Sequence, residues 1–245
     1  MKLSISIRKS IYWLFGIILA LNGFSLFLRF LIRYMGLDIS EGFWHLFDTA
    51  GEANITSWFS SVLLLINGAL LLLITRVKTH SADSFARHWN ILAWIFFFLS
   101  MDEIAGLHEK LIAPLRNATD ASGIFYFAWV IVAILFVLLF IFLYSRFLLN
   151  LPHKTAIQFV VAGAVFVIGA LGFEMLGGIF HGVTYIYRGL TVVEETLENL
   201  GAGLFIVSLL AYAKTNLRST PVIIKIIDAT YSNLGSELVA VEILK

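Results

Sequence analysis

Four ionisable side chains follow one of the most apolar runs in the chain. The stretch LSMDEIAGLHEK, at positions 99–110, places Asp102, Glu103, His108 and Glu109 directly after the run WIFFFLS. Histidine together with Asp and Glu is the usual ligand set for zinc, iron or manganese. A neighbouring carboxylate can then accept a proton from water bound to such an ion. The stretch by itself also fits a helix end that reaches water.

Two later segments carry side chains of the same kind at helical spacing. Glu174 and His181 are seven residues apart, and Glu194 and Glu195 precede Glu198 by four and three residues. Residues at these distances share one face of a helix. Glu194 also fits a first-turn charge favoured by the helix dipole. Small residues, which let membrane helices approach closely, lie beside these groups: Ala105, Gly106, Gly177, Gly178, Gly201 and Gly203.

The composition indicates that most of the chain lies in lipid. Of its 245 residues, 60% are hydrophobic and 13% are charged, whereas soluble domains carry about 25% charged residues. The chain has no cysteine, so disulfides and thiolate ligands are excluded and any metal must be held by His, Asp and Glu. It has no block of basic residues, which argues against a nucleic-acid partner.

Six segments are long and apolar enough to cross a bilayer, which takes about 20 residues. We therefore predict an all-α fold, a polytopic bundle of six transmembrane helices in a domain formed by residues 1–218. Residues 219–245 are predicted to form an amphipathic tail on the cytoplasmic surface. The predicted spans are 11–32, 56–75, 89–109, 125–145, 156–180 and 191–213.

The basic residues predict the orientation of this bundle. With these spans, twelve of the seventeen Lys and Arg residues fall on the side of the termini, whereas twelve of the sixteen acids fall on or near the other side. Cytoplasmic loops are enriched in Lys and Arg. Both termini are therefore predicted to be cytoplasmic, with the protein in the plasma (inner) membrane.

A count of helical rise brings the acidic side chains to one level. At about 1.5 Å per residue, Asp102 lies about 20 Å from the cytoplasmic end of its span, Glu174 about 27 Å and Glu198 about 23 Å. Three helices thus deliver carboxylates to the outer third of the bundle. An unpaired carboxylate at this depth costs on the order of several kcal/mol. Protons or a bound cation must therefore compensate these charges.

These observations predict a divalent metal site, with zinc, iron or manganese as candidate ions. Glu103 or Glu194 is predicted to act as the catalytic base. The chain contains neither HExxH nor ExxH. The prediction therefore depends on carboxylates from three helices lying at the same depth. The predicted metal ligands are Asp102, His108, Glu109, Glu174, His181, Glu195 and Glu198.

The functional expectation is a metal-dependent membrane enzyme acting on a lipid or another amphiphile, with hydrolysis as the default reaction. Two alternatives stay open. The carboxylates could form a cation or proton relay in a transporter, although the polar residues available for the cytoplasmic half are few. They could also form a structural hydrogen-bonded network in an accessory subunit of a larger membrane complex.

Overall fold

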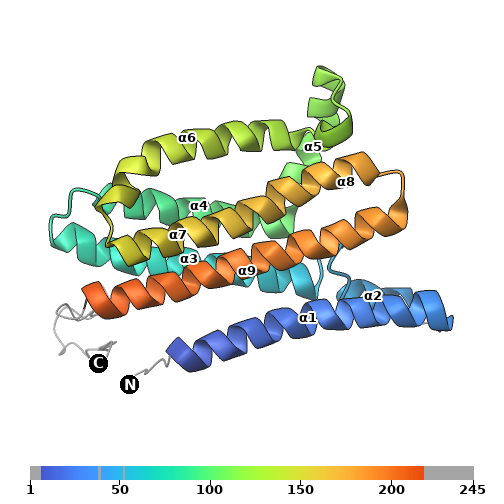
Figure 1. Cartoon of the computed structure of the whole chain (residues 1–245), viewed down its shortest axis with the longest axis horizontal. Coiled ribbons are helices and arrows are strands. Elements are labelled where there is room, and N and C mark those ends of the chain that lie inside the picture. Colours follow the sequence, from blue (N-terminus) through green and yellow to red (C-terminus); the bar gives the residue numbers. More distant parts are fainter. Residues whose placement is uncertain (1–6, 38–39, 52, 218–245) are drawn as a thin grey trace, which may run out of the picture.

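The computed structural model describes residues 7–37, 40–51 and 53–217. The predicted cytoplasmic tail, 219–245, lies outside the described residues. Within them all regular structure is helical, which confirms the predicted all-α class (Figure 1). The elements are α1 (Ile7–Met35), α2 (Glu41–Leu46), α3 (Ile55–His80), α4 (Ala86–Ala105), α5 (Leu107–Thr119), the 3₁₀ turn η1 (Gly123–Phe125), α6 (Trp129–Asn150), α7 (His153–Val167), the π-helix η2 (Ile168–Phe173), α8 (Glu174–Phe180) and α9 (Thr184–Asn216).

Five continuous helical segments are long and apolar enough to cross a membrane. The pair α4–α5 provides a sixth only if its two bent parts are counted together. The prediction of six spans is therefore supported as five or six helices of sufficient length. The continuous segments are Ile11–Met35, Ile55–His80, Trp129–Asn150, His153–Phe180 and Thr184–Asn216.

The long helices run roughly parallel or antiparallel to one another, so the connections gather at two ends (Figure 1). The start of α1, the α3–α4 and α6–α7 connections and the end of α9 lie together, and we call this the basic end. The helices α2 and α5, the turn η1 and the α8–α9 connection lie at the opposite end, which we call the carboxylate end.

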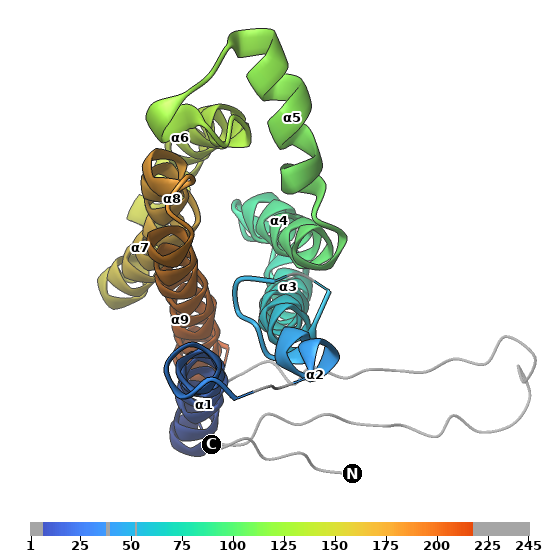
Figure 2. The ribbon, with the colours of Figure 1, turned by 90° about the vertical axis from the view of Figure 1, so that its right-hand side faces the viewer.

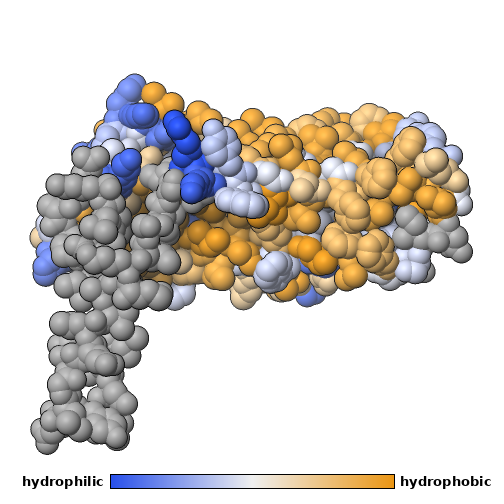
Figure 3. Space-filling view, turned by 90° about the horizontal axis from the view of Figure 1, so that it is seen from below, coloured by the Kyte–Doolittle hydropathy of each residue, from blue (hydrophilic) through white to orange (hydrophobic). Residues whose placement is uncertain are grey.

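Helix α9 is the central packing element. It contacts α1, α3, α7, η2 and α8, while α3 also packs along α4. Seen end-on, α1, α9, α7 and α8 form one column beside α3 and α4, and α5 runs from α4 towards α6 (Figure 2). One face of the molecule shows a broad apolar middle, with most of its hydrophilic side chains near the basic end (Figure 3). This surface is what a bundle surrounded by lipid requires.

Two buried apolar clusters fill the bundle between its ends. One surrounds Trp89 and includes Phe147 and Tyr212. The other joins Ile18 of α1 to α3 and α9. Burial of such side chains contributes about 25 cal/mol per Å² in water, but in lipid their close packing becomes the main attraction between helices.

The predicted span 89–109 is wrong at its C-terminal end. The helix α4 ends at Ala105, and α5 begins at Leu107 with its axis turned by 79°. Gly106 between them has φ +56°, a left-handed conformation that glycine adopts without the steric cost of a Cβ atom. Asp102 and Glu109 are seven residues apart and would share one face of a continuous helix, but the bend places them on two different helices. Most of the segment between the predicted spans 89–109 and 125–145 is helical as α5.

Candidate functional site

Asp102 holds the two sides of the α4–α5 bend together. Its Oδ1 accepts a hydrogen bond from the backbone N–H of His108 at 2.9 Å, and its Oδ2 lies 2.8 Å from His108 Nδ1. The first contact satisfies a donor in the first turn of α5, which has no partner within its own helix. The second fixes the orientation of the imidazole, as a carboxylate does for a histidine that binds metal or moves a proton.

Trp129 continues this line of contacts to the next helices. Its ring centre lies 4.7 Å from that of His108. Its Nε1–H donates a hydrogen bond of 3.0 Å to Glu174 Oε1. Trp129 opens α6 and Glu174 opens α8, so one indole links α5, α6 and α8. Trp129 does not stand out in the sequence, because an aromatic residue at the start of a span is explained by interfacial anchoring alone.

Glu174 also meets a second buried carboxyl group. Glu174 is 8% exposed and Glu194 of α9 is 9% exposed, and their carboxyl groups interact electrostatically with each other. Two buried carboxylates that are both ionised repel each other, so a proton or a cation is needed to offset their charge. The description of Glu194 as a first-turn charge is wrong, because α9 already begins at Thr184.

Glu198 joins the cluster from the next turn of α9. It is half-buried and interacts electrostatically with Glu103 and Asp102 of α4 and with His108 and Glu174. The structure thus places acidic side chains of α4, α8 and α9 within electrostatic range of one another. We call Asp102, Glu103, His108, Glu174, Glu194 and Glu198 the carboxylate cluster.

The π-helix η2 sets the position of Glu174 against α9. Its Gly169 packs so closely that a Cβ atom there would lie 2.9 Å from Leu197 Cβ and 3.0 Å from Glu194 O. The extra residue in a π-turn also rotates the chain that follows it, and such turns occur often at functional sites. Glu174 comes directly after η2, so this turn decides which way its carboxyl group faces.

Three predicted ligands lie less centrally. Glu109 is exposed on α5, although it still interacts electrostatically with Glu174. His181 follows α8, where its Nδ1 lies 2.8 Å from Gly178 O and its ring stacks on Tyr126 at 3.7 Å. Glu195 is half-buried, and its backbone carbonyl accepts a hydrogen bond from Asn199. Glu174 and His181 are seven residues apart in the sequence, but the structure records no contact between their side chains.

Among the residues that the structure describes, no group of three or more His, Asp or Glu side chains is arranged to hold a metal ion. The cluster consists instead of pairwise contacts, between Asp102 and His108 and between Glu174 and Glu194. A shared ion would need these pairs to turn towards one point.

The interior offers little polar continuity from the cluster towards the basic end. Ser208 donates to Leu204 O of its own helix at 2.7 Å, and Asn67 donates to the backbone carbonyls of Leu63 and Ala202 at 3.1 and 3.0 Å. These side chains bind backbone rather than one another, and the Trp89 cluster follows them. The polar contacts of these two residues therefore do not extend the carboxylate cluster towards the basic end.

One known protein family matches most of this chain. The model of a domain of unknown function, DUF8692, matches residues 11–213. The chain belongs to the DUF8692 family. The matched region covers all or nearly all of each described helix that is long enough to cross a membrane, and it contains all six members of the carboxylate cluster. No curated protein and no solved structure matches the chain.

Proposed function

We propose that this DUF8692 protein is an integral membrane protein of the plasma (inner) membrane that binds a divalent cation in its carboxylate cluster. In this proposal both termini are cytoplasmic and the cluster lies near the outer leaflet. The bound ion supports an enzymatic reaction, hydrolysis by default, on a lipid or another amphiphile. A substrate of that class is favoured because the cluster lies at the depth of the helix ends rather than in a soluble domain.

The observation that carries the proposal is the burial of Glu174 beside Glu194 with neither a lysine nor an arginine paired to them. Among the described residues, none of the ion pairs joins a lysine or an arginine to either carboxyl group. Buried carboxylates are costly unless they are paired, protonated or bound to a metal. Glu198 adds a third carboxyl group to the same region, so a doubly charged cation would compensate the cluster more effectively than one proton.

The residues of the cluster suit separate roles in such a reaction. When bound, a divalent ion activates water for hydrolysis. His108, Glu174 and Glu198 would hold it, and Asp102 would keep the imidazole of His108 oriented. Glu103 or Glu194 would accept the proton of the attacking water and return it to the leaving group.

A second candidate function is proton transfer, which the proximity of the buried carboxyl groups of Glu174 and Glu194 favours. A carboxyl pair on two helices can release and take up one proton with a small movement. Transport through the membrane would also need polar groups towards the basic end, and the apolar clusters there argue against it.

Elemental analysis of protein purified in mild detergent tests the metal proposal. The wild type, loaded separately with zinc, iron and manganese, is expected to retain about one ion per chain after gel filtration. The double variant Glu174→Gln and Glu198→Gln is expected to lose it, because amides are much poorer ligands for these ions than carboxylates. Asp120→Asn, which alters an exposed acid at the same end, is the matched control and should retain the ion.

Absence of a retained ion in the wild type after all three loadings would overturn the metal proposal. Retention by the double variant at the wild-type level would overturn the assignment of the site. Proton flux into proteoliposomes, followed with a pH-sensitive dye, tests the second candidate function. Flux that is present in the wild type and absent in Glu174→Gln would support proton transfer.

A further inference from the structure

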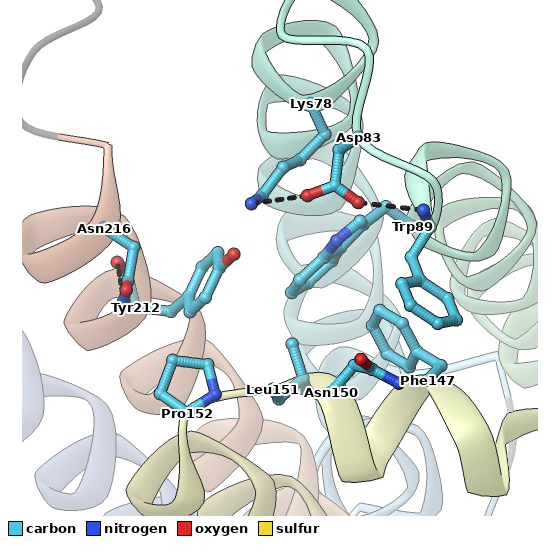
Figure 4. A pocket seen from close by; sticks show the side chains of 10 residues that line it. Lys78, Asp83, Trp89, Phe147, Asn150, Leu151, Pro152, Tyr212 and Asn216 are labelled. Atoms are coloured by element: carbon cyan, nitrogen blue, oxygen red, sulfur yellow. Dashed lines mark hydrogen bonds and ion pairs between the residues drawn. The ribbon is translucent and has the colours of Figure 1, made fainter.

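A cavity of about 170 Å³ opens at the basic end of the bundle, away from the carboxylate cluster. The ends of α3, α6 and α9 and the start of α4 surround it. In Figure 4, Lys78 and Asp83 lie on one side, Tyr212 and Asn216 on a second, and Asn150 with Leu151 on a third. A cavity of about 150 Å³ accommodates a molecule the size of benzene, so this one is large enough for a small polar group.

Aromatic side chains form the walls of the cavity. The ring centre of Trp89 lies 5.0 Å from that of Phe147 and 5.0 Å from that of Tyr212. All three residues belong to the buried apolar cluster, so their positions are fixed by packing. Lys78 Nζ lies over the ring of Tyr212, 5.7 Å from its centre, so the aromatic wall already stabilises one positive group at the rim.

An ion pair places both signs of charge at the rim. Lys78 Nζ lies 2.8 Å from Asp83 Oδ2, and the backbone N–H of Phe85 donates to Asp83 Oδ1 at 2.8 Å. Partial burial of Asp83 opposes its ionisation, but the hydrogen bonds from Lys78 and Phe85 outweigh this effect and lower the pKa of Asp83 below its ordinary value. Asp83 is therefore an anion at neutral pH, beside a cation on Lys78.

The mouth of the cavity lies where apolar helix surface ends. Asn150 lines the cavity as the last residue of α6, and Leu149 beside it is 84% exposed. Phe142, nearly two turns earlier, is 76% exposed. The acyl chains of a lipid could lie along this apolar face of α6 while the headgroup enters the cavity. A soluble ligand would make no use of the apolar face.

We propose that this cavity binds the zwitterionic headgroup of a phospholipid. The phosphate lies near Lys78 and the amide hydrogen of Asn150 that is not donated to Arg146 O, while the ammonium lies near Asp83. The surrounding basic residues alone would favour anionic lipids, but Asp83 inside the rim favours a headgroup that carries its own positive charge. This inference uses the proposed membrane location and does not depend on the carboxylate cluster.

Native mass spectrometry of delipidated protein tests the inference. The protein is offered phosphatidylethanolamine, phosphatidylcholine and phosphatidylglycerol of identical acyl chains, in equal amounts. The wild type is expected to retain the two zwitterionic lipids in preference to phosphatidylglycerol. The charge-neutral double variant Lys78→Gln and Asp83→Asn should reduce that retention by roughly tenfold, the cost of losing a hydrogen bond to a charged group.

Three comparisons complete the test. Lys154→Gln removes an exposed positive charge at the same end but outside the cavity, and it should leave the preference unchanged. Asn150→Ala weakens the site without touching the ion pair and should show a smaller loss, which keeps the test valid if the double variant does not fold. Free phosphoethanolamine should not displace the lipid, whereas displacement would assign the site to a soluble headgroup compound.

Equal retention of all three lipids by the wild type would overturn the inference, as would an unchanged preference in the double variant. The cavity would then be a structural feature of the loop packing. The variant Glu174→Gln with Glu198→Gln should keep the lipid preference, so failure here and failure of the metal proposal are distinguishable.

Discussion

Asp102 combines a structural contact with a contact to the cluster. Its two carboxylate oxygens bind the backbone N–H and the ring Nδ1 of His108, six residues later in the chain. The first contact stabilises the bend after Gly106, and the second orients the imidazole that faces Trp129. Any effect of Asp102 on the proposed chemistry therefore acts through His108.

Replacement of Asp102 by Ala is expected to lower the free energy of unfolding by about 1–3 kcal/mol, because it leaves the N–H of His108 and the imidazole without their acceptor. Thermal unfolding of the detergent-purified protein measures the loss. Glu109→Ala, at an exposed position on α5, should change stability by at most about 0.5 kcal/mol. An equal loss in both variants would contradict the role given to Asp102.

The elements that position the cluster depart from regular α-helix at two places. Gly106 turns the chain by 79° between α4 and α5, and η2 inserts a π-turn between α7 and α8. The bend brings His108 back towards Asp102, and the π-turn delivers Glu174 to Glu194. Both irregularities lie within a few residues of the carboxyl groups, as expected where local geometry serves a site.

Gly169→Ala tests whether close contact of η2 with α9 sets the cluster. A Cβ atom at 169 would lie 3.0 Å from Glu194 O, so the two elements must separate. The expected loss of stability is about 1–3 kcal/mol, together with weaker metal retention in the proposed site. Unfolding temperature and elemental analysis measure the two effects.

Gly163→Ala is the matched control, because nothing lies within 4 Å of a Cβ atom at this position of α7. Alanine in an open helical position is more favourable than glycine by about 1 kcal/mol, so the control should be neutral or slightly stabilising. If Gly169→Ala behaved in the same way, η2 would not be a constrained contact.

At the scale of the whole molecule, the two ends of the bundle differ in chemistry. The α3–α4 and α6–α7 connections lie at the basic end with the cavity, and the cluster lies near α5 at the other (Figure 1). The proposed orientation assigns the basic end to the cytoplasm by the distribution of Lys and Arg. The two proposed sites would then face opposite leaflets.

Single cysteines can test this orientation, since the chain has none of its own. Ser81→Cys introduces a thiol at an exposed position of the basic end, and Ala118→Cys does so in exposed α5. A membrane-impermeant maleimide should label Ala118→Cys in intact cells, and Ser81→Cys only after permeabilisation. Labelling of both thiols in intact cells would contradict the crossing of the membrane, and the reverse pattern would contradict the orientation.

The sequence by itself determined the all-α class and the approximate positions of the long apolar helices, and it indicated a common level along the bundle for Asp102, Glu174 and Glu198. Each of these follows from composition and from a constant rise per residue. The cap of α3, where Asn54 Oδ1 accepts from the N–H groups of Thr56 and Ser57, is also local, since an Asn directly before an apolar helix favours this contact.

Only the tertiary structure decided which of these side chains meet. A count along a straight helix could not show that Gly106 bends the chain, nor that η2 changes the rotation before Glu174. The indole of Trp129 reaches a carboxyl group 45 residues away, and Glu174 finds Glu194 on another helix. Such contacts depend on how helices pack and turn against each other, which periodicity within a single helix does not encode.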